Sequence, residues 1–178
     1  MTATANIIPP NETQRLEAVR RYEILDTPPD GTFDRITALA SEIFDMPIAL
    51  VTIVDEDRIW FKSRFGLDGV EQVPRDPGLC ASAILQDEPY IVEEARRDPR
   101  TLTNPLVRGQ FGLQFYAATA LRTGDGYRLG TLCLIDREPR MFSPRQAHVL
   151  DRLSEIVVDE MELRLSAIRA VAAARRRD

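Results

Sequence analysis

The sequence predicts an α+β fold in which helices and loops cover both faces of a central antiparallel sheet. The first sign is the run IALVTIV at 48–54, which is apolar or β-branched almost throughout, as in a strand buried on both faces. The acidic link at 55–57 is too short for a parallel return, so the strand at 58–65 should pair antiparallel. An Asp-Gly step likewise separates two strand-like runs, 114–122 and 127–136, as in a hairpin.

The N-terminal part predicts two helices in front of the first strand. Residues 1–10 lack periodicity and are expected to form a flexible leader. Asn11 can cap a helix over 12–22, whose apolar stripe is narrow and whose charged residues, Arg15 among them, are expected to be exposed. A helix over about 32–45 should cover the sheet with one apolar face, formed by Phe33, Ile36, Leu39, Ala40 and Ile43.

The middle of the chain predicts short elements joined by long loops. Residues 66–78 form a polar loop with several prolines, and 79–85 a short helix of small residues. A short strand at 89–92 follows, and then a charged loop or helix at 93–104. This part of the chain can give one face of the sheet only a thin cover.

A long helix should end the chain. Ser143, Pro144 and Gln146 are typical of a helix start, and apolar residues at steps of 3 and 4 extend the helix over 144–174. At ~1.5 Å per residue this helix would exceed about 45 Å, more than the width of one small domain. Its distal half therefore needs another partner, and we expect a homodimer through helices 12–22 and 144–174.

Composition narrows the classes of function. The net charge of -5 disfavours general binding to nucleic acid or to an anionic membrane. The chain has no apolar run of membrane-spanning length and no signal-peptide pattern at its start, which predicts a cytoplasmic protein. His148 is the single histidine and has no cysteine near it, so we expect no metal site.

No set of catalytic residues stands out. Cys80 and Cys133 lie in apolar surroundings and are expected to be free thiols in a reducing compartment. Catalysis by Cys80 with His148 as its base is conceivable, but a buried small side chain is the commoner role of such a cysteine. The sequence thus predicts no catalytic residues and no enzyme, and it leaves the cofactor open.

A ligand pocket is the remaining candidate. The thin cover predicted for one face of the sheet, over about 66–112, can leave a concavity. In the second hairpin Ala117 and Thr119 share one face, whereas Ala118 and Thr131 share the other. These small residues would leave room for a ligand on either face, or would only admit close helix packing.

Five stretches of the chain, in order, resemble the GAF domains found upstream of bacterial sensor histidine kinases and diguanylate cyclases. They are NETQRLEAVRRYEILDTPPDGTFDRIT, PIALVTIVDEDRIWFKSRFGL, PRDPGLCASAI, ARRDPRTLTNPLV and YRLGTLCLID. The resemblance implies a GAF domain over 11–165, with 166–178 as the distal end of a signalling helix and a basic tail. It also implies an α+β fold with a central antiparallel sheet of five to six strands and helices on both faces. The terminal helices would lie on one face, a ligand pocket beneath loops and short helices on the other, and signalling would rearrange helices in a dimer.

The chain lacks the sequence motifs by which other members of the wider family attach a bilin, reduce methionine sulfoxide or bind a cyclic nucleotide. Phytochrome-like members attach a bilin through a cysteine usually followed by histidine, but Ala81 follows Cys80. GAF-type free-methionine-sulfoxide reductases use several cysteines, and this chain has two. The motif of the cyclic-nucleotide-binding members is absent, and Ala-Thr-Ala at 118–120 replaces the Gly-Ala-Pro frequent in the closer group.

We therefore expect a non-enzymatic sensory module that binds an unknown small molecule and signals to a histidine kinase or cyclase partner. The alternatives are a thiol-based redox enzyme or sensor using Cys80 and Cys133, and a dimerisation module without a ligand. The pocket is expected between the strand Phe115–Leu121 and the cover near Cys80 and Asn104. Its expected ligand-binding residues are Trp60, Cys80, Asp98, Asn104, Phe115, Ala117 and Thr119.

Overall fold

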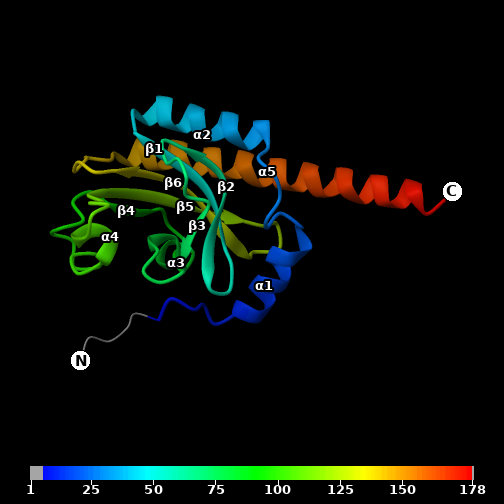
Figure 1. Cartoon of the computed structure of the whole chain (residues 1–178), viewed down its shortest axis with the longest axis horizontal. Coiled ribbons are helices and arrows are strands. Elements are labelled where there is room, and N and C mark those ends of the chain that lie inside the picture. The colour runs from blue at the N-terminus through cyan, green and yellow to red at the C-terminus, as the bar shows by residue number, and fades with distance from the viewer. Residues whose placement is uncertain (1–5, 178) are drawn as a thin grey trace.

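The computed structural model describes residues 6–177, which form one six-stranded antiparallel sheet with helices and loops on both faces (Figure 1). Neighbouring strands pair in the order β3-β2-β1-β6-β5-β4. The strands are β1 (Ile48–Val54), β2 (Arg58–Phe65), β3 (Gln72–Pro74), β4 (Tyr90–Val92), β5 (Phe115–Arg122) and β6 (Arg128–Asp136). The predicted α+β class with an antiparallel sheet is confirmed.

β1 is the central strand, as the run 48–54 predicted. All seven of its residues are buried, and it pairs with β2 on one side and β6 on the other. Its alternate side chains point to opposite faces, so Ala49, Val51 and Ile53 join one apolar cluster, whereas Ile48 and Leu50 join the other. A bulge in the pairing with β2 leaves Lys62 opposite no single residue of β1.

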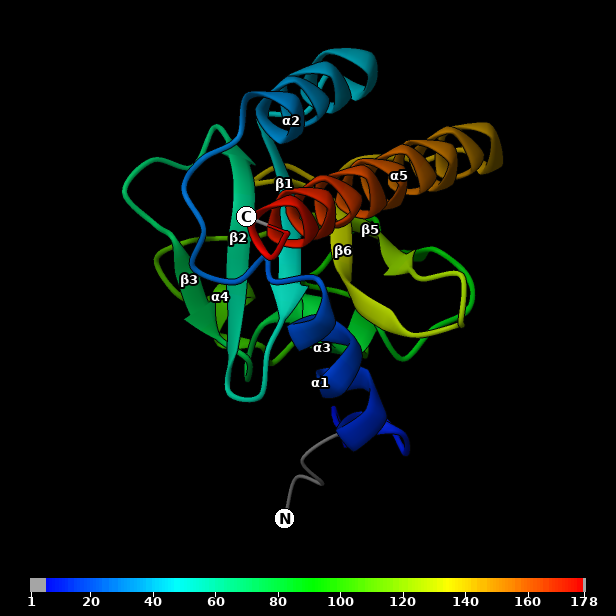
Figure 2. The ribbon, with the colours of Figure 1, turned by 90° about the vertical axis from the view of Figure 1, so that its right-hand side faces the viewer.

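Three helices form the thicker layer. α2 (Gly31–Phe44) and α5 (Pro144–Arg175) lie over one face of the sheet, as the end view in Figure 2 shows. α1 (Glu12–Arg21) packs at one end of the sheet and contributes Ala18 and Val19 to the same apolar cluster. The helix layer therefore encloses the larger of the two cores.

The buried stripe of α2 differs from the predicted one. Phe33, Ile36 and Ala40 are buried as expected, but Leu39 and Ile43 are each 48% exposed. Their places in the interface are taken by the hydroxyl residues Thr37 and Ser41. Thr37 bonds to Ser63 of β2 at 2.9 Å, and Ser41 donates to the carbonyl of Met46 at 2.5 Å. Because polar residues with partners can be buried, hydrophobicity alone placed the stripe too far round the helix.

α5 extends well beyond the domain. Its 32 residues span about 48 Å at 1.5 Å per residue, and Ser143 and Gln146 form a capping box at its start. The last buried residue of the helix is Leu165, and the part that follows projects past the sheet and the other helices (Figure 1). The prediction of a helix longer than its own domain is thus confirmed.

Short elements and loops cover the opposite face of the sheet and are called the roof below (residues 66–113). The roof contains α3 (Leu79–Ala83), α4 (Pro105–Arg108) and the edge strands β3 and β4. The sequence did not predict β3 or α4. Each is only three or four residues long, too short to show a periodicity, and each contains a proline.

Two details differ from the predictions. The predicted hairpin of β5 and β6 is confirmed, but in its turn, residues 123–127, Gly126 has a positive φ and Asp125 does not. Asp125 pairs instead with the guanidinium of Arg21. Of the predicted leader, residues 1–5 lie outside the described part, while Pro9 is buried and the carbonyl of Ile7 accepts a hydrogen bond from Arg75.

Among the helices of residues 6–177, none is long and apolar enough to cross a membrane.

Candidate functional site

A cavity of about 140 Å³ lies between the sheet and the roof. Its floor consists of side chains from four strands, which alternate toward this face of the sheet. Its walls and cover come from the roof. The lining residues are Leu50, Ile59, Phe61, Leu67, Val70, Val73, Gly78, Leu79, Cys80, Leu106, Phe111, Leu113, Tyr116 and Ile135. None of these side chains is charged.

Gly78 brings the roof close to the sheet. A Cβ atom at this position would lie 2.2 Å from Cδ1 of Ile59 and 3.1 Å from the carbonyl oxygen of Arg75. A side chain at this position would therefore displace the end of the Ile59 side chain and press on the carbonyl of Arg75. The small size of Gly78 thus lets the roof lie close to Ile59 of β2, which lines the cavity.

Asn104 and Asp98 brace the roof rather than line the cavity. The side chain of Asn104 donates to the carbonyl of Pro77 at 2.9 Å and accepts from the amide of Leu106 at 2.8 Å, so it joins the two segments that lead into α3 and α4. Asp98 pairs with Arg100, whose guanidinium lies over the ring of Tyr90. The hydrogen bonds from Arg100 hold the pKa of Asp98 below its usual value.

Cys80 is the one predicted site residue that lines the cavity. Its sulfur accepts hydrogen bonds from the hydroxyl of Tyr116 at 3.0 Å and from that of Thr131 at 3.4 Å. The interaction with the thiol of Cys133, and then the hydrogen bonds from the hydroxyls, hold the pKa of Cys80 below its usual value, although burial acts against this shift. The same interaction with Cys80, followed by burial, raises the pKa of Cys133 well above its usual value. Both thiols are free and buried.

The other four predicted site residues lie on the opposite face of the sheet. Trp60, Phe115 and Ala117 belong to the cluster under the helices, and Thr119 donates to the carbonyl of Leu150 in α5 at 3.4 Å. Phe115 packs against Phe142 with ring centroids 5.5 Å apart. The structure therefore does not bring these four together with Cys80 and Asn104, and Tyr116 is the residue of the strand Phe115–Leu121 that lines the cavity.

Sequence reasoning missed most of the residues that line the cavity because it placed the pocket on the other face of β5. Phe115 and Tyr116 alternate along one strand, and both faces of β5 are apolar, so neither face is marked as the floor. Alternation along the hairpin places Tyr116 and Ile135 on one face, and the structure pairs them. The otherwise polar loop 66–78 also contains several apolar residues. Leu67, Val70 and Val73 in that loop were the signal that could have identified the wall of the cavity.

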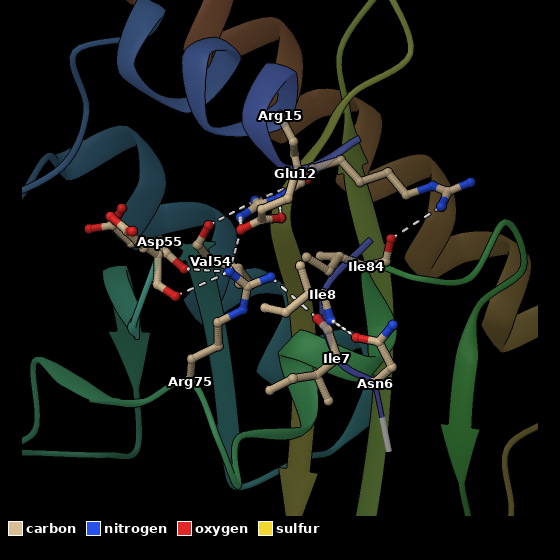
Figure 3. Close-up of polar contacts among 11 residues, drawn as sticks. Asn6, Ile7, Ile8, Glu12, Arg15, Val54, Asp55, Arg75 and Ile84 are labelled. Carbon is tan, nitrogen blue, oxygen red and sulfur yellow. Dashed lines mark hydrogen bonds and ion pairs between the residues drawn. The ribbon is translucent and has the colours of Figure 1, made fainter. Parts of the chain in front are cut away.

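Two arginines and one glutamate form a buried ionic cluster beside the roof (Figure 3). Arg15 binds both oxygens of Glu12 at 2.8 and 3.0 Å, and Arg75 binds the same carboxylate. Arg15 is 1% exposed and Arg75 3%, although the sequence placed Arg15 on the surface. Terminal nitrogens of the two guanidinium groups also donate to backbone carbonyls, including Val54 at 2.8 Å and Asp55 at 3.1 Å, whereas Nε of Arg75 has no partner.

The cluster joins α1 to the wall of the cavity. Arg75 stands between Val73 and Gly78, which both line the cavity, and Glu12 begins α1. The hydrogen bonds from Arg15 and Arg75 lower the pKa of Glu12 to about 2, although burial, the largest single influence, acts in the opposite direction.

The other end of α1 is tied to α5. The hydroxyl of Tyr22, just after α1, donates to the carboxylate of Glu162, and Arg164 donates to the carbonyl of Tyr22 at 3.0 Å. Burial, followed by the hydrogen bond to Glu162, raises the pKa of Tyr22 to about 12. α1 is therefore held by polar contacts to the cavity wall at its start and to the long helix at its end.

Within the described residues, no group of three or more His, Cys, Asp or Glu side chains is placed to hold a metal ion.

A single antiparallel sheet with a roofed cavity on one face and helices on the other defines the class of small α+β domains to which this chain belongs. The chain belongs to the GAF domain family, whose model matches residues 28–160. This finding confirms the resemblance seen in the sequence.

One curated protein is similar to this chain in sequence. A cyclic di-GMP phosphodiesterase of Pseudomonas aeruginosa is 39% identical over 151 residues, which are 84% of this chain and 26% of that protein. The chain thus spans about a quarter of the length of this curated relative.

Solved structures match at the level of the fold. The free methionine-R-sulfoxide reductase from Neisseria meningitidis superimposes with a TM-score of 0.64 and 17% identity, over 87% of this chain and 90% of the other. The GAF domain of an Acinetobacter phosphoenolpyruvate-protein phosphotransferase gives 0.60 and 16%, over 90% and 98%.

Proposed function

We propose that this chain is a regulatory GAF module that binds a small molecule in the roofed cavity and passes the signal on through α5 in a homodimer. The observation that carries the proposal is the cavity of about 140 Å³ on the face opposite the long helix. The space also speaks against a dimerisation module whose pocket is filled by its own side chains. The module acts in regulation rather than catalysis, because no group in the cavity is arranged as a nucleophile with a base.

A physical route leads from the cavity to α5. A molecule that enters the cavity presses on the wall between Val73 and Gly78, from which Arg75 reaches the carboxylate of Glu12. A shift of Arg75 therefore moves the start of α1. Since Tyr22 bonds to Glu162, the other end of α1 transfers the shift to α5. Ligand-free and ligand-bound packing would differ in these contacts, which is the condition for a ligand to shift the equilibrium.

The exposed side of α5 supplies the surface for a second copy. Ile156 is 51% exposed and Leu163 64%, and they stand seven residues apart, the spacing of a seam between paired helices. α2 packs beside α5 and exposes Leu39 and Ile43. The apolar side chains of α1, which the sequence led us to place in the interface, are buried in their own domain. The proposed interface therefore consists of α5 and α2.

Leu163→Asp should dissociate the dimer. An isolated carboxylate at the seam must be dehydrated without a partner, so the dissociation constant should rise about 100-fold or more. Arg169→Asp is the matched control, because residue 169 is also exposed but lies about 120° round the helix from residue 163. Sedimentation equilibrium measures the dissociation constant of the dimer for both variants. A dimer of unchanged affinity in Leu163→Asp would remove α5 from the interface.

The signal should reach an output module of another protein or of a longer chain. The relative from Pseudomonas aeruginosa is named a cyclic di-GMP phosphodiesterase, and most of its length has no counterpart in this chain. A phosphodiesterase therefore joins the histidine kinases and cyclases as a proposed output.

Thiol chemistry is the second candidate, favoured by the hydrogen bonds that lower the pKa of Cys80. The reaction would convert a sulfoxide to a thioether and water while Cys80 and Cys133 are oxidised to a disulfide. Because both thiols are buried, we expect no turnover of free methionine sulfoxide beyond the rate of Cys80→Ser/Cys133→Ser. The assay follows oxidation of an added dithiol reductant. A rate lost in the double variant would establish the thiol reaction and overturn the purely regulatory assignment.

A further inference from the structure

The chemistry of the cavity defines the class of its ligand. We infer that it takes an uncharged, apolar molecule about the size of benzene, and not a nucleotide, a carboxylate or a phosphate ester. The inference rests on the proposed function in one respect, that this cavity is the ligand site. It goes further because it names what the site admits and what it rejects.

The first argument is volume. The cavity measures about 140 Å³, close to the ~150 Å³ of an engineered cavity lined by Leu, Ile and Phe that stays dry and binds benzene. A cyclic dinucleotide is several times larger than this space. A single six-membered ring or a short branched chain fills it.

The second argument is the lack of partners for polar groups. The lining side chains are aliphatic or aromatic apart from Cys80 and Tyr116. The hydroxyl of Tyr116 already donates to the sulfur of Cys80, at 3.0 Å, and the hydroxyl of Thr131 also bonds to that sulfur. The polar atoms at the floor are therefore engaged with one another. A charged ligand would lose its hydration and find no counter-charge, which costs far more than apolar contact returns.

The third argument is access. Leu67, Val70, Val73, Leu106 and Phe111 line the cavity and are only half-buried, and all five belong to the roof. The mouth of the cavity is thus apolar and made of loops, of the short edge strand β3 and of the short helix α4. These are the elements that can move aside most easily, because short segments with solvent-exposed backbone open at low cost.

The test compares two probes that share one ring. Benzene is uncharged, whereas phenyl phosphate carries negative charge on the same ring. At ten times its dissociation constant, benzene should raise the melting temperature by about 3–6 °C. Phenyl phosphate at the same concentration should leave it unchanged. Binding of phenyl phosphate as tight as that of benzene would overturn the inference.

Two variants locate the site. Leu106→Trp fills the cavity and should abolish the shift with benzene, because Leu106 lines it. Leu102→Trp is the control, since Leu102 is also half-buried and close in sequence but is not among the lining residues. If Leu106→Trp does not fold, NMR contacts between bound benzene and the methyl groups of Leu50 and Leu113 show whether benzene lies in this cavity. Absence of these contacts in the wild-type chain would overturn the assignment to this cavity.

A separate measurement distinguishes a failure of the inferred ligand class from a failure of the proposed function. Hydrogen exchange over residues 166–175 reports on the exposed half of α5 in the same samples. If benzene binds and exchange there does not change, the ligand class stands and the transmission to α5 fails. If benzene does not bind while Leu163→Asp still dissociates the dimer, the ligand class fails and the dimeric module stands.

Discussion

Gly130→Ala should destabilise the domain by about 4 kcal/mol or more, and a large part of the protein should fail to fold. A Cβ atom on Gly130 would lie 1.8 Å from the carbonyl oxygen of Thr52 and 2.8 Å from Cα of Ile53. These atoms belong to the backbone of β1, which is paired on both sides. No rotation of a side chain can relieve the overlap, so β6 would have to separate from the centre of the sheet.

The matched control is Gly124→Ala in the loop of the same hairpin. A Cβ atom there meets nothing within 4 Å, and Gly124 is not among the residues with positive φ. We expect a change of less than about 0.5 kcal/mol. Urea unfolding followed by circular dichroism measures both variants. Equal midpoints for Gly130→Ala and the wild type would mean that β1 and β6 are not paired at this register.

The sheet could be predicted from the sequence because its central elements are long and unambiguous. The run 48–54 is buried on both faces, so it has no polar side that could mislead an assignment. Short links fixed antiparallel pairing for β1 with β2 and for β5 with β6. The capping residues Ser143 and Gln146 likewise fixed the start of α5. These features depend on local chemistry, which the sequence displays directly.

The site was harder to predict because it depends on which face of the sheet is roofed. Phe115 and Tyr116 are both fully buried, Phe115 under the helices and Tyr116 at the floor of the cavity. A pattern of alternating apolar residues is the same for both assignments. The choice is made by the roof, whose segments are brought together by contacts such as that of Asn104 with Pro77. Such contacts between distant segments leave no periodic signal.

The buried arginines were missed for a different reason. Charged residues on a helix are usually solvated, so Arg15 was counted with the exposed side of its helix. Its guanidinium is buried because Glu12, three residues earlier, lies on the same side of α1 and is shared with Arg75. Arg75 lies 63 residues from Glu12 in the chain. A sequence pattern within one helix therefore shows one half of the cluster and not the other.

Glu12→Ala should destabilise the protein by about 3 kcal/mol at neutral pH, because it leaves two buried guanidinium groups without a carboxylate. Arg15 and Arg75 are 1% and 3% exposed, so water cannot replace the lost partner at low cost. Glu17→Ala is the control, since Glu17 lies on the same helix and is exposed, and it should change stability by less than about 0.5 kcal/mol. In the double variant Glu12→Ala/Arg75→Met, part of the loss should be recovered, because one unpaired charge is gone.

The dependence on pH gives the same cluster a second, independent signature. The pKa of Glu12 is about 2 in the folded protein against 4.5 as its ordinary value, so its contribution to stability is complete above pH 4.5 and disappears as the pH falls toward 2. By pH 3 the wild type should lose about 2 kcal/mol more than Glu12→Gln, which has no proton to take up at this site. Urea unfolding at pH 7 and pH 3 measures the difference. A loss as large in Glu12→Gln as in the wild type would show that the carboxylate is not held between the two arginines. It would also break the first link of the proposed route from the cavity to α5, since Arg75 could not move α1 through a group that it does not bind.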